Sequence, residues 1–212
     1  MPCLKVCGIT DVAFAVEAAR RGVGYLGLIF ANGSPRRVAP EVALAIAERV
    51  RETLPNPPRF VGVFTTQYAD EIEGIARLVK LDTIQLHGDY GAGIVTRLKA
   101  KGYEVWILHK RESSGAERLA DAVLLDGRDG SRQGGTGKCA DWSLVAPLKA
   151  AGRRVVLAGG ISADNIAAAA ATGADVIDVN SSLEISPGVK SIERLDSLLN
   201  QVLRLHVEMV LR

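Results

Sequence analysis

The feature that most constrains this chain is an eightfold alternation of short apolar runs with stretches of helical periodicity. Most of the runs are apolar at consecutive positions, which is typical of strands that are covered on both faces. They are Leu4–Cys7, Tyr25–Phe30, Phe60–Phe64, Thr83–Leu86, Glu104–Leu108, Ala122–Asp126, Val155–Ala158 and Val176–Asn180. The alternation therefore predicts parallel strands, each followed by a helix.

The intervening stretches carry helix signals. Thr10 and Asp11 can cap the first helix, and Pro40 stands in a first turn. The expected helices are Asp11–Arg21, Pro40–Thr53, Ala69–Lys80, Tyr90–Ala100, Trp142–Ala151, Ala163–Thr172 and Val189–His206. The connection after the fifth strand, Lys110–Ala120, has room for only a turn or two, so we expect its helix to be short or irregular.

Eight such units fit a single (β/α)8 barrel, the TIM-barrel fold, over residues 1–212, or an open doubly wound sheet of similar strand count. The barrel is favoured because no GxGxxG follows the first strand. The glycine-rich turns come late instead, after strands six to eight, where barrels commonly hold a phosphate. The sequence predicts one barrel domain.

Composition and charge exclude several classes of protein. Lys and Arg number 26 against 24 Asp and Glu, and the net charge of +2 is scattered, which argues against a nucleic-acid partner. No apolar run approaches the ~18 to 20 residues of a membrane helix, and the first strand begins too early for a signal peptide. We therefore expect a cytoplasmic protein without a membrane partner.

The chain has three cysteines, too few for a framework of paired disulfides in a chain of this length. None has a zinc-like spacing to another Cys or His, so no metal site is expected. Any cysteine that matters acts as a thiol.

In a barrel, residues that end strands point into the catalytic mouth. Cys7 ends the first strand beside Gly8; a buried Cys is commonly a small hydrophobe, but a thiolate here could abstract a proton. Asp126 ends the sixth strand, where partial desolvation would let it hold a proton as a general acid; the alternative is a loop-opening Asp that bonds backbone. Asp178 lies inside the eighth strand, where we expect a structural hydrogen bond.

Three further polar residues follow strands at the mouth. Arg36 follows the second strand and could bind a substrate carboxylate with both arms of its guanidinium, although most loop arginines are simply solvated. Gln85 and His87 end the fourth strand, as substrate-binding candidates or as satisfied structural residues.

Glycine-containing turns provide candidates for binding a phosphate. Gly159 and Gly160 precede the seventh expected helix, and Ser181 and Ser182 follow the eighth strand. Backbone amides at such turns attract a dianion. Residues Gly134, Gly135, Thr136 and Gly137 form a GGTG segment that could be a lid over the site.

Taken together, these residues resemble the phosphoribosylanthranilate isomerase family over nearly the whole chain. The ordered matches are KVCGIT (5–10), GLIFANGSPRRV (27–38), VGVF (61–64), QLHG (85–88), LLD (124–126), GGTG (134–137) with Asp141 and Trp142, LAGGI (157–161) and PGVK (187–190). Two segments depart from the family pattern. The usual DxSSGxE ending of strand eight reads DVNSSLE, with Ser182 in place of glycine, and the fifth strand lacks a Lys-Ala pair.

The resemblance implies an Amadori rearrangement of N-(5′-phosphoribosyl)anthranilate in tryptophan biosynthesis. It implies Asp126 as general acid, Cys7 as general base and Arg36 facing the anthranilate carboxylate. Phosphate would bind near Gly159, Gly160, Ser181 and Ser182. The substrate nitrogen serves as the electron sink, so no cofactor is expected. The partner is a small phosphosugar, and the family includes monomers and homodimers.

Two other functions compete with this one. The related sugar isomerase of histidine biosynthesis uses aspartates in both catalytic positions and has an internal half-barrel repeat, whereas here the first position is Cys7. A catalytically silent barrel that binds a phosphosugar is disfavoured by the placement of Cys7, Asp126 and Arg36 at mouth positions.

Overall fold

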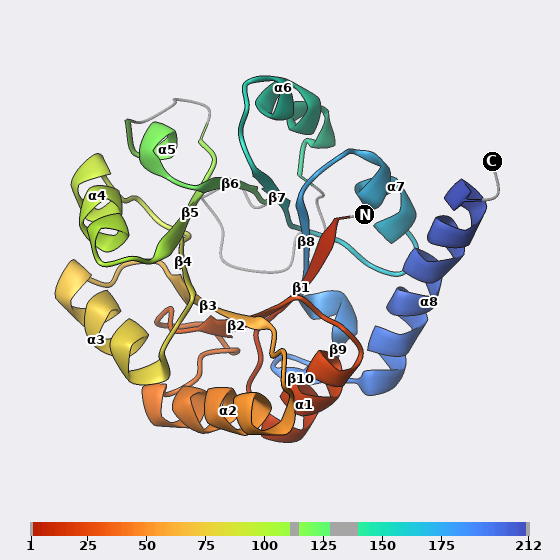
Figure 1. The fold of residues 1–212 in the computed structure, drawn as a ribbon, viewed down its shortest axis with the longest axis horizontal. Coiled ribbons are helices and arrows are strands. Elements are labelled where there is room, and N and C mark those ends of the chain that lie inside the picture. Colours follow the sequence, from red (N-terminus) through yellow and green to blue (C-terminus); the bar gives the residue numbers. More distant parts are fainter. Residues whose placement is uncertain (1, 111–114, 128–139, 211–212) are drawn as a thin grey trace.

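The eight strands close into one parallel barrel in chain order, with β8 paired back to β1 (Figure 1). A computed structural model describes residues 2–110, 115–127 and 140–210. The barrel strands are β1 (Cys3–Cys7), β2 (Tyr25–Ile29), β3 (Arg59–Phe64), β4 (Thr83–Leu86), β5 (Glu104–Leu108), β6 (Ala122–Leu125), β7 (Val155–Leu157) and β8 (Val176–Val179). The predicted barrel is confirmed, and the open-sheet alternative is wrong.

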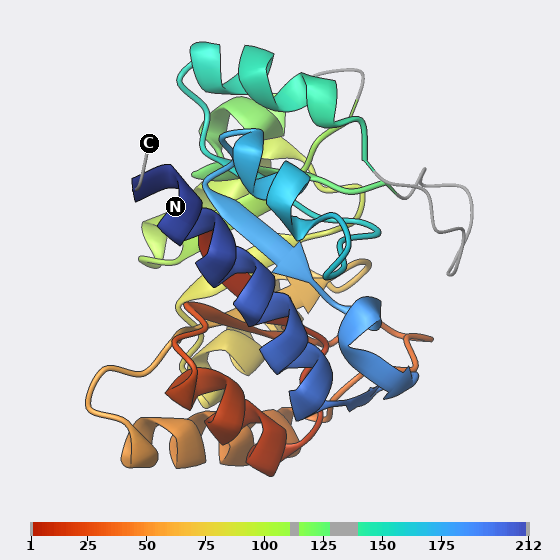
Figure 2. The same ribbon diagram turned by 90° about the vertical axis from the view of Figure 1, so that its right-hand side faces the viewer.

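Helices form a ring outside the strands (Figure 1). They are α1 (Val12–Arg20), α2 (Pro40–Thr53), α3 (Ala69–Val79), α4 (Ala92–Ala100), α5 (Gly115–Leu119), α6 (Val145–Ala150), α7 (Ile166–Ala171) and α8 (Ile192–Val210), with 3-10 turns η1 (Trp142–Leu144) and η2 (Ser181–Leu183). Figure 2 shows α8 running along the outside of the barrel, where it packs against α1 and α7. The five residues of α5 confirm the short helix expected after the fifth strand.

Apolar side chains fill both faces of the strands. One cluster lies between the strands and the surrounding helices, and a second fills the barrel interior. Trp106 in β5 is fully buried in the interior cluster and meets Tyr25 of β2 edge to face, with ring centroids 5.1 Å apart. Because successive side chains alternate between the two clusters, the strands read as unbroken apolar runs.

The helix starts follow local chemistry. The Asp11 carboxylate accepts a hydrogen bond from the Phe14 amide at 2.7 Å and caps α1. Pro40 opens α2, where the missing N–H costs nothing. The predictions for Asp11 and Pro40 are confirmed, whereas Thr10 does not cap the helix and its hydroxyl donates to the Gly188 carbonyl instead.

The helix expected over Val189–His206 begins later than predicted. Val189 and Lys190 form β10 (Val189–Lys190), which pairs antiparallel with β9 (Glu184–Ser186). Gly188, at φ +84°, makes the turn between the two strands. The Ser191 hydroxyl then accepts a hydrogen bond from the Arg194 amide at 3.2 Å, so α8 begins at Ile192. We call residues 184–190 the β9–β10 hairpin.

The seventh helix also begins three residues after its predicted start at Ala163. The Asn165 side chain accepts a hydrogen bond from the Ser162 amide at 2.9 Å, which makes a turn before α7 begins at Ile166. Within residues 2–110, 115–127 and 140–210, no helix combines the length and the apolarity that crossing a bilayer requires.

Candidate active site

A buried ion pair joins the first and last strands inside the barrel. The Lys5 ammonium donates a hydrogen bond to Asp178 Oδ2 at 2.6 Å, and the Lys5 side chain has no exposed surface. The two residues are directly opposed in the β1–β8 register. Burial alone would lower the pKa of Lys5, but the charges of Asp178 and Cys7 outweigh it and raise that pKa. Lys5 is therefore a fixed cation beneath the mouth.

Cys7 ends β1 two residues beyond Lys5, as predicted, and its side chain therefore projects on the same face of the strand. Burial raises the pKa of the Cys7 thiol, while the charge and the hydrogen bond of Lys5 act against that rise. The thiol is thus held in its neutral form by its surroundings and has a cation beside it that favours the thiolate.

Asp126 follows β6 directly and meets His87, which follows β4. The two side chains lie 3.0 Å apart, between His87 Nε2 and Asp126 Oδ2. Gly159 makes room for the carboxylate, since a Cβ at that position would lie 2.7 Å from Asp126 Oδ1. Its φ of +86° adds a second reason for glycine there.

Asp178 lies on β8 opposite Lys5 and is buried with it. Burial raises the pKa of Asp178, and Lys5 opposes that rise; the smaller influences of Asp126 and His87 act in opposite directions. Asp178 is therefore a buried carboxyl group that is held by Lys5 and influenced by the charges of Asp126 and His87.

Five buried side-chain atoms lack hydrogen-bond partners among the described residues, and three of them are oxygens on barrel strands: Thr83 Oγ1, Gln85 Oε1 and Asp178 Oδ1. Gln85 lies on β4, as predicted from the sequence. A buried acceptor without a donor is costly, so such atoms suit a ligand that brings hydroxyl groups.

Arg36 lies in the loop after β2, beside the start of the β1 loop. Its Nε and Nη2 atoms donate to the two oxygens of Glu184, each at 2.7 Å. Lys190 Nζ contacts Glu184 Oε1 at 3.2 Å and Asn180 Oδ1 at 3.0 Å. Burial opposes ionisation of Glu184, but Arg36 and Lys190 overcome it and lower its pKa. Two cations therefore share one carboxylate.

The residues expected to bind phosphate lie on two neighbouring loops, after β7 and after β8. Gly159 and Gly160 come two and three residues after the end of β7, and Ser181 and Ser182 open the 3-10 turn η2. The expected lid, residues 134–137, lies outside the described residues. Within the described ranges, no three His, Cys, Asp or Glu side chains gather closely enough to hold a metal ion.

Comparison with known proteins identifies the family of the chain. A family model described as N-(5′-phosphoribosyl)anthranilate (PRA) isomerase matches residues 4–201, which is nearly the whole chain. The chain belongs to the PRA isomerase family.

Relatives of the chain carry the same family name. An N-(5′-phosphoribosyl)anthranilate isomerase from Citrifermentans bemidjiense is 37% identical over 92% of this chain and 94% of its own length. Other curated relatives are longer, and the chain spans 47% of one and 41% of another.

Solved structures agree with this assignment. A phosphoribosyl anthranilate isomerase from Thermus thermophilus is 34% identical, covers 96% of this chain and 99% of its own, and superposes with a TM-score of 0.82. A PRA isomerase in complex with reduced 1-(o-carboxyphenylamino)-1-deoxyribulose 5-phosphate is 27% identical, covers 95% and 98% of the two chains and has a TM-score of 0.76.

Ser182 stands where the PRA isomerase family usually has glycine, and the structure explains how it fits. Lys80 is the only non-glycine residue with positive φ in the described chain, so the backbone at Ser182 needs no glycine. The Ser182 hydroxyl donates to the Ile161 carbonyl at 2.6 Å. The serine thus ties the β8 loop to the β7 loop.

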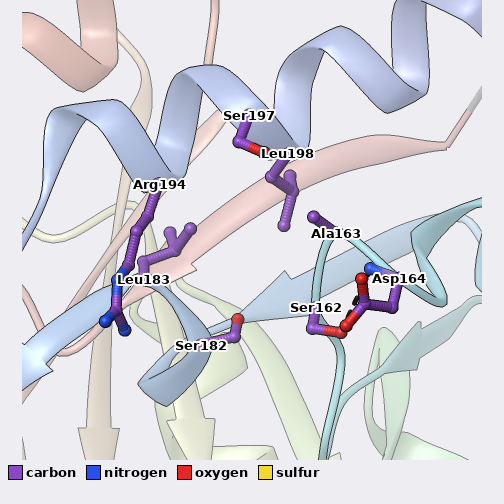
Figure 3. A pocket seen from close by; sticks show the side chains of 8 residues that line it. All are labelled: Ser162, Ala163, Asp164, Ser182, Leu183, Arg194, Ser197 and Leu198. Atoms are coloured by element: carbon purple, nitrogen blue, oxygen red, sulfur yellow. Dashed lines mark hydrogen bonds between the residues drawn. The ribbon is translucent and has the colours of Figure 1, made fainter.

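A cavity of about 230 Å³ lies behind these loops. Figure 3 shows the side chains that line it. Ser162 and Asp164 of the β7 loop lie on one side of it, with Ser182 of η2 below and Ser197 of α8 above. The cavity lies between the loops and α8, so it is separate from the interior that holds Lys5.

Sequence reasoning did not assign roles to four residues of this candidate site: Lys5, Asn180, Glu184 and Lys190. A signal for Lys5 was present, since a residue two positions before Cys7 in a strand shares its face. Glu184 and Lys190 flank a Pro-Gly pair, which is a turn signal.

Proposed function

We propose that this chain catalyses the Amadori rearrangement of N-(5′-phosphoribosyl)anthranilate to 1-(2-carboxyphenylamino)-1-deoxyribulose 5-phosphate, a step of tryptophan biosynthesis. The observation that carries the proposal is that Cys7 and Asp126 both stand at the carboxyl ends of parallel barrel strands, Cys7 two residues beyond the Lys5–Asp178 ion pair and Asp126 at 3.0 Å from His87. The membership of the PRA isomerase family supports it throughout the chain.

Ring opening is the first step. Asp126, close to His87, gives its proton to the ribose ring oxygen. The C1–O bond breaks as the nitrogen lone pair forms a C1=N double bond, which leaves an iminium cation. Asp126 becomes a carboxylate, and the cation acidifies the hydrogen on C2.

Proton abstraction is the second step, and Cys7 performs it as a thiolate. The C2–H electron pair forms C1=C2, and the iminium electrons return to nitrogen. The resulting enolamine loses the proton of its C2 hydroxyl and gains one at C1, which gives the ketone. Lys5 favours the thiolate, and the iminium cation does so further once it forms.

Binding groups orient the substrate for these steps. In this proposal Arg36 faces the anthranilate carboxylate, and the loops with Gly160 and Ser181 hold the phosphate. Gln85 Oε1 and Asp178 Oδ1 accept hydrogen bonds from sugar hydroxyls. His87 acts through Asp126.

The same proposal includes a cytoplasmic location, because a base that works as a free thiol needs a reducing compartment. The phosphosugar is the partner, and the assembly is a monomer or a homodimer. No cofactor enters the steps above.

The test follows anthranilate fluorescence as freshly prepared phosphoribosylanthranilate is consumed. We expect turnover by the unmodified chain and losses of at least ~10²-fold in kcat for Cys7→Ser and for Asp126→Asn. Cys3→Ser and Asp70→Asn, exposed residues of the same types, serve as matched controls and should keep full activity. Full activity in Cys7→Ser or Asp126→Asn would remove that residue from the mechanism.

A further inference from the structure

The β9–β10 hairpin holds the guanidinium of Arg36 by one edge. Arg36 Nε and Nη2 both bond to Glu184, which leaves the two hydrogens of Nη1 and the second hydrogen of Nη2 for another carboxylate. Nη1 has no hydrogen-bond partner among the described residues. The grip therefore fixes which edge of Arg36 is available.

Glu184 is itself firmly held. Its side chain is 4% exposed, and its backbone carbonyl accepts a hydrogen bond from Arg194. Lys190 lies opposite Glu184 in the hairpin, is 1% exposed and binds the same carboxylate. A side chain that is packed and bonded in this way can orient its partner.

The hairpin is in turn fastened to the first two loops of the barrel. The Thr10 hydroxyl donates to the Gly188 carbonyl at 2.7 Å. A Cβ at Gly188 would lie 3.1 Å from the Pro35 carbonyl, so the turn packs closely on the residue before Arg36. The hairpin thus contacts the loop that follows Cys7 and the loop that carries Arg36.

We propose that Glu184 is a positioning residue that sets selectivity for a substrate with a carboxylate on its amine substituent, by presenting the Nη1 edge of Arg36 to that carboxylate. The inference rests on the proposed function and names the origin of its specificity. Glu184 itself touches no reacting atom.

Charge alone and the positioning of Arg36 predict opposite effects of Glu184→Gln on the binding of an anionic substrate. Arg36, Lys190 and Glu184 together carry one net positive charge. Glu184→Gln raises this to two, which would strengthen attraction to an anionic substrate. A positioning role predicts weaker capture instead, because the neutral amide can accept only one of the two bonds and Arg36 is free to turn.

The experiment compares two substrates, the adducts of ribose 5-phosphate with anthranilate and with aniline, which lacks the carboxylate. Rearrangement of both is followed by chromatography, and selectivity is the ratio of their kcat/KM values. We expect Glu184→Gln to lower this ratio at least about tenfold, mainly through KM for the anthranilate adduct. Glu184→Asp keeps the charge but is too short for both bonds, and should fall between.

A double-variant cycle shows whether Glu184 acts through Arg36. Arg36→Met should abolish most of the selectivity, and adding Glu184→Gln to it should lower the ratio no further. Glu193→Gln, an exposed carboxylate that bonds Ser191, is the matched control with unchanged selectivity.

Several outcomes would overturn the inference. Equal losses for both adducts would make Glu184 merely structural, and an unchanged or increased ratio would contradict positioning. If Glu184→Gln does not fold by circular dichroism, the intermediate ratio expected for Glu184→Asp decides. Failure of the unmodified chain to rearrange the anthranilate adduct would instead reject the proposed function.

Discussion

The charged groups at the two ends of the barrel interior differ in how completely they are paired. At the N-terminal ends of the strands, Glu104 receives hydrogen bonds or ion pairs from Arg59, Arg154 and Trp106 Nε1. Arg154 also donates to the Tyr25 hydroxyl at 2.7 Å. Every one of these groups bonds to another within the cluster, which closes this end of the barrel.

At the mouth, the charged groups are paired only in part. Lys5 holds one oxygen of Asp178, and Glu184 holds one edge of Arg36, so each pair leaves a polar atom over. Unsatisfied buried polar atoms cost stability. The comparison shows that the charged groups at the N-terminal ends of the strands close the barrel, whereas those at the mouth keep donors and acceptors that a ligand can use.

The largest effect that separates the two ends is expected from Lys5→Met. Without the ammonium the pKa of Cys7, already raised by burial, rises further, so less thiolate exists at neutral pH. We expect kcat/KM at neutral pH to fall about 10- to 1000-fold, and the rising limb of its pH profile to move upward.

Two companion variants make this result specific. Lys5→Met alone leaves Asp178 as an unpaired buried carboxylate, which can impair folding. The double variant Lys5→Met with Asp178→Asn removes both buried charges, so its activity can be compared without that loss of stability. Lys101→Met, on the exposed surface, should leave the profile unchanged. An unchanged pH profile of kcat/KM in Lys5→Met would show that Lys5 at the mouth does not favour the Cys7 thiolate.

Glu104→Gln should affect stability alone. Removing the carboxylate leaves Arg59 and Arg154 without their shared partner, but both are about a third or more exposed, so water compensates in part. We expect a loss of about 2 to 3 kcal/mol in the free energy of unfolding by urea, with kcat unchanged. A fall in kcat without a fall in stability would contradict the division of roles.

The smallest change in stability and activity is expected from Ser182→Gly, which tests a hydrogen bond between two loops of the mouth. It removes the hydrogen bond to the Ile161 carbonyl and restores the residue usual in the family. We expect a loss of about 1 kcal/mol of stability and little change in KM, because Ser182 needs no positive φ. Tighter substrate capture in this variant would show that the serine obstructs the phosphate.

The barrel was predictable from the sequence because each strand is apolar on both faces and each helix has its own local signals. The positions of Cys7 and Asp126 at the mouth were also predictable, because a polar residue at the carboxyl end of an apolar barrel strand lies at the mouth. The pairing of Lys5 with Asp178 was not, because it joins residues 173 positions apart through the register of β1 and β8.

The hairpin was missed for a different reason. The apolar residues after Pro187 continue the helical period of α8, and that period concealed the Pro-Gly turn signal. The close approaches at Gly159 and Gly188 also depend on neighbours from other loops, which local propensity does not report.

The seam between β1 and β8 has a consequence for the order in which the protein is made. Lys5 is synthesised 173 positions before its counterion Asp178, and Arg36 is synthesised 148 positions before Glu184. A nascent chain that still lacks residues 178–184 has a buried lysine with no carboxylate and an arginine that Glu184 does not yet orient. The site can therefore be completed only after that segment has been made and has docked against the first strands.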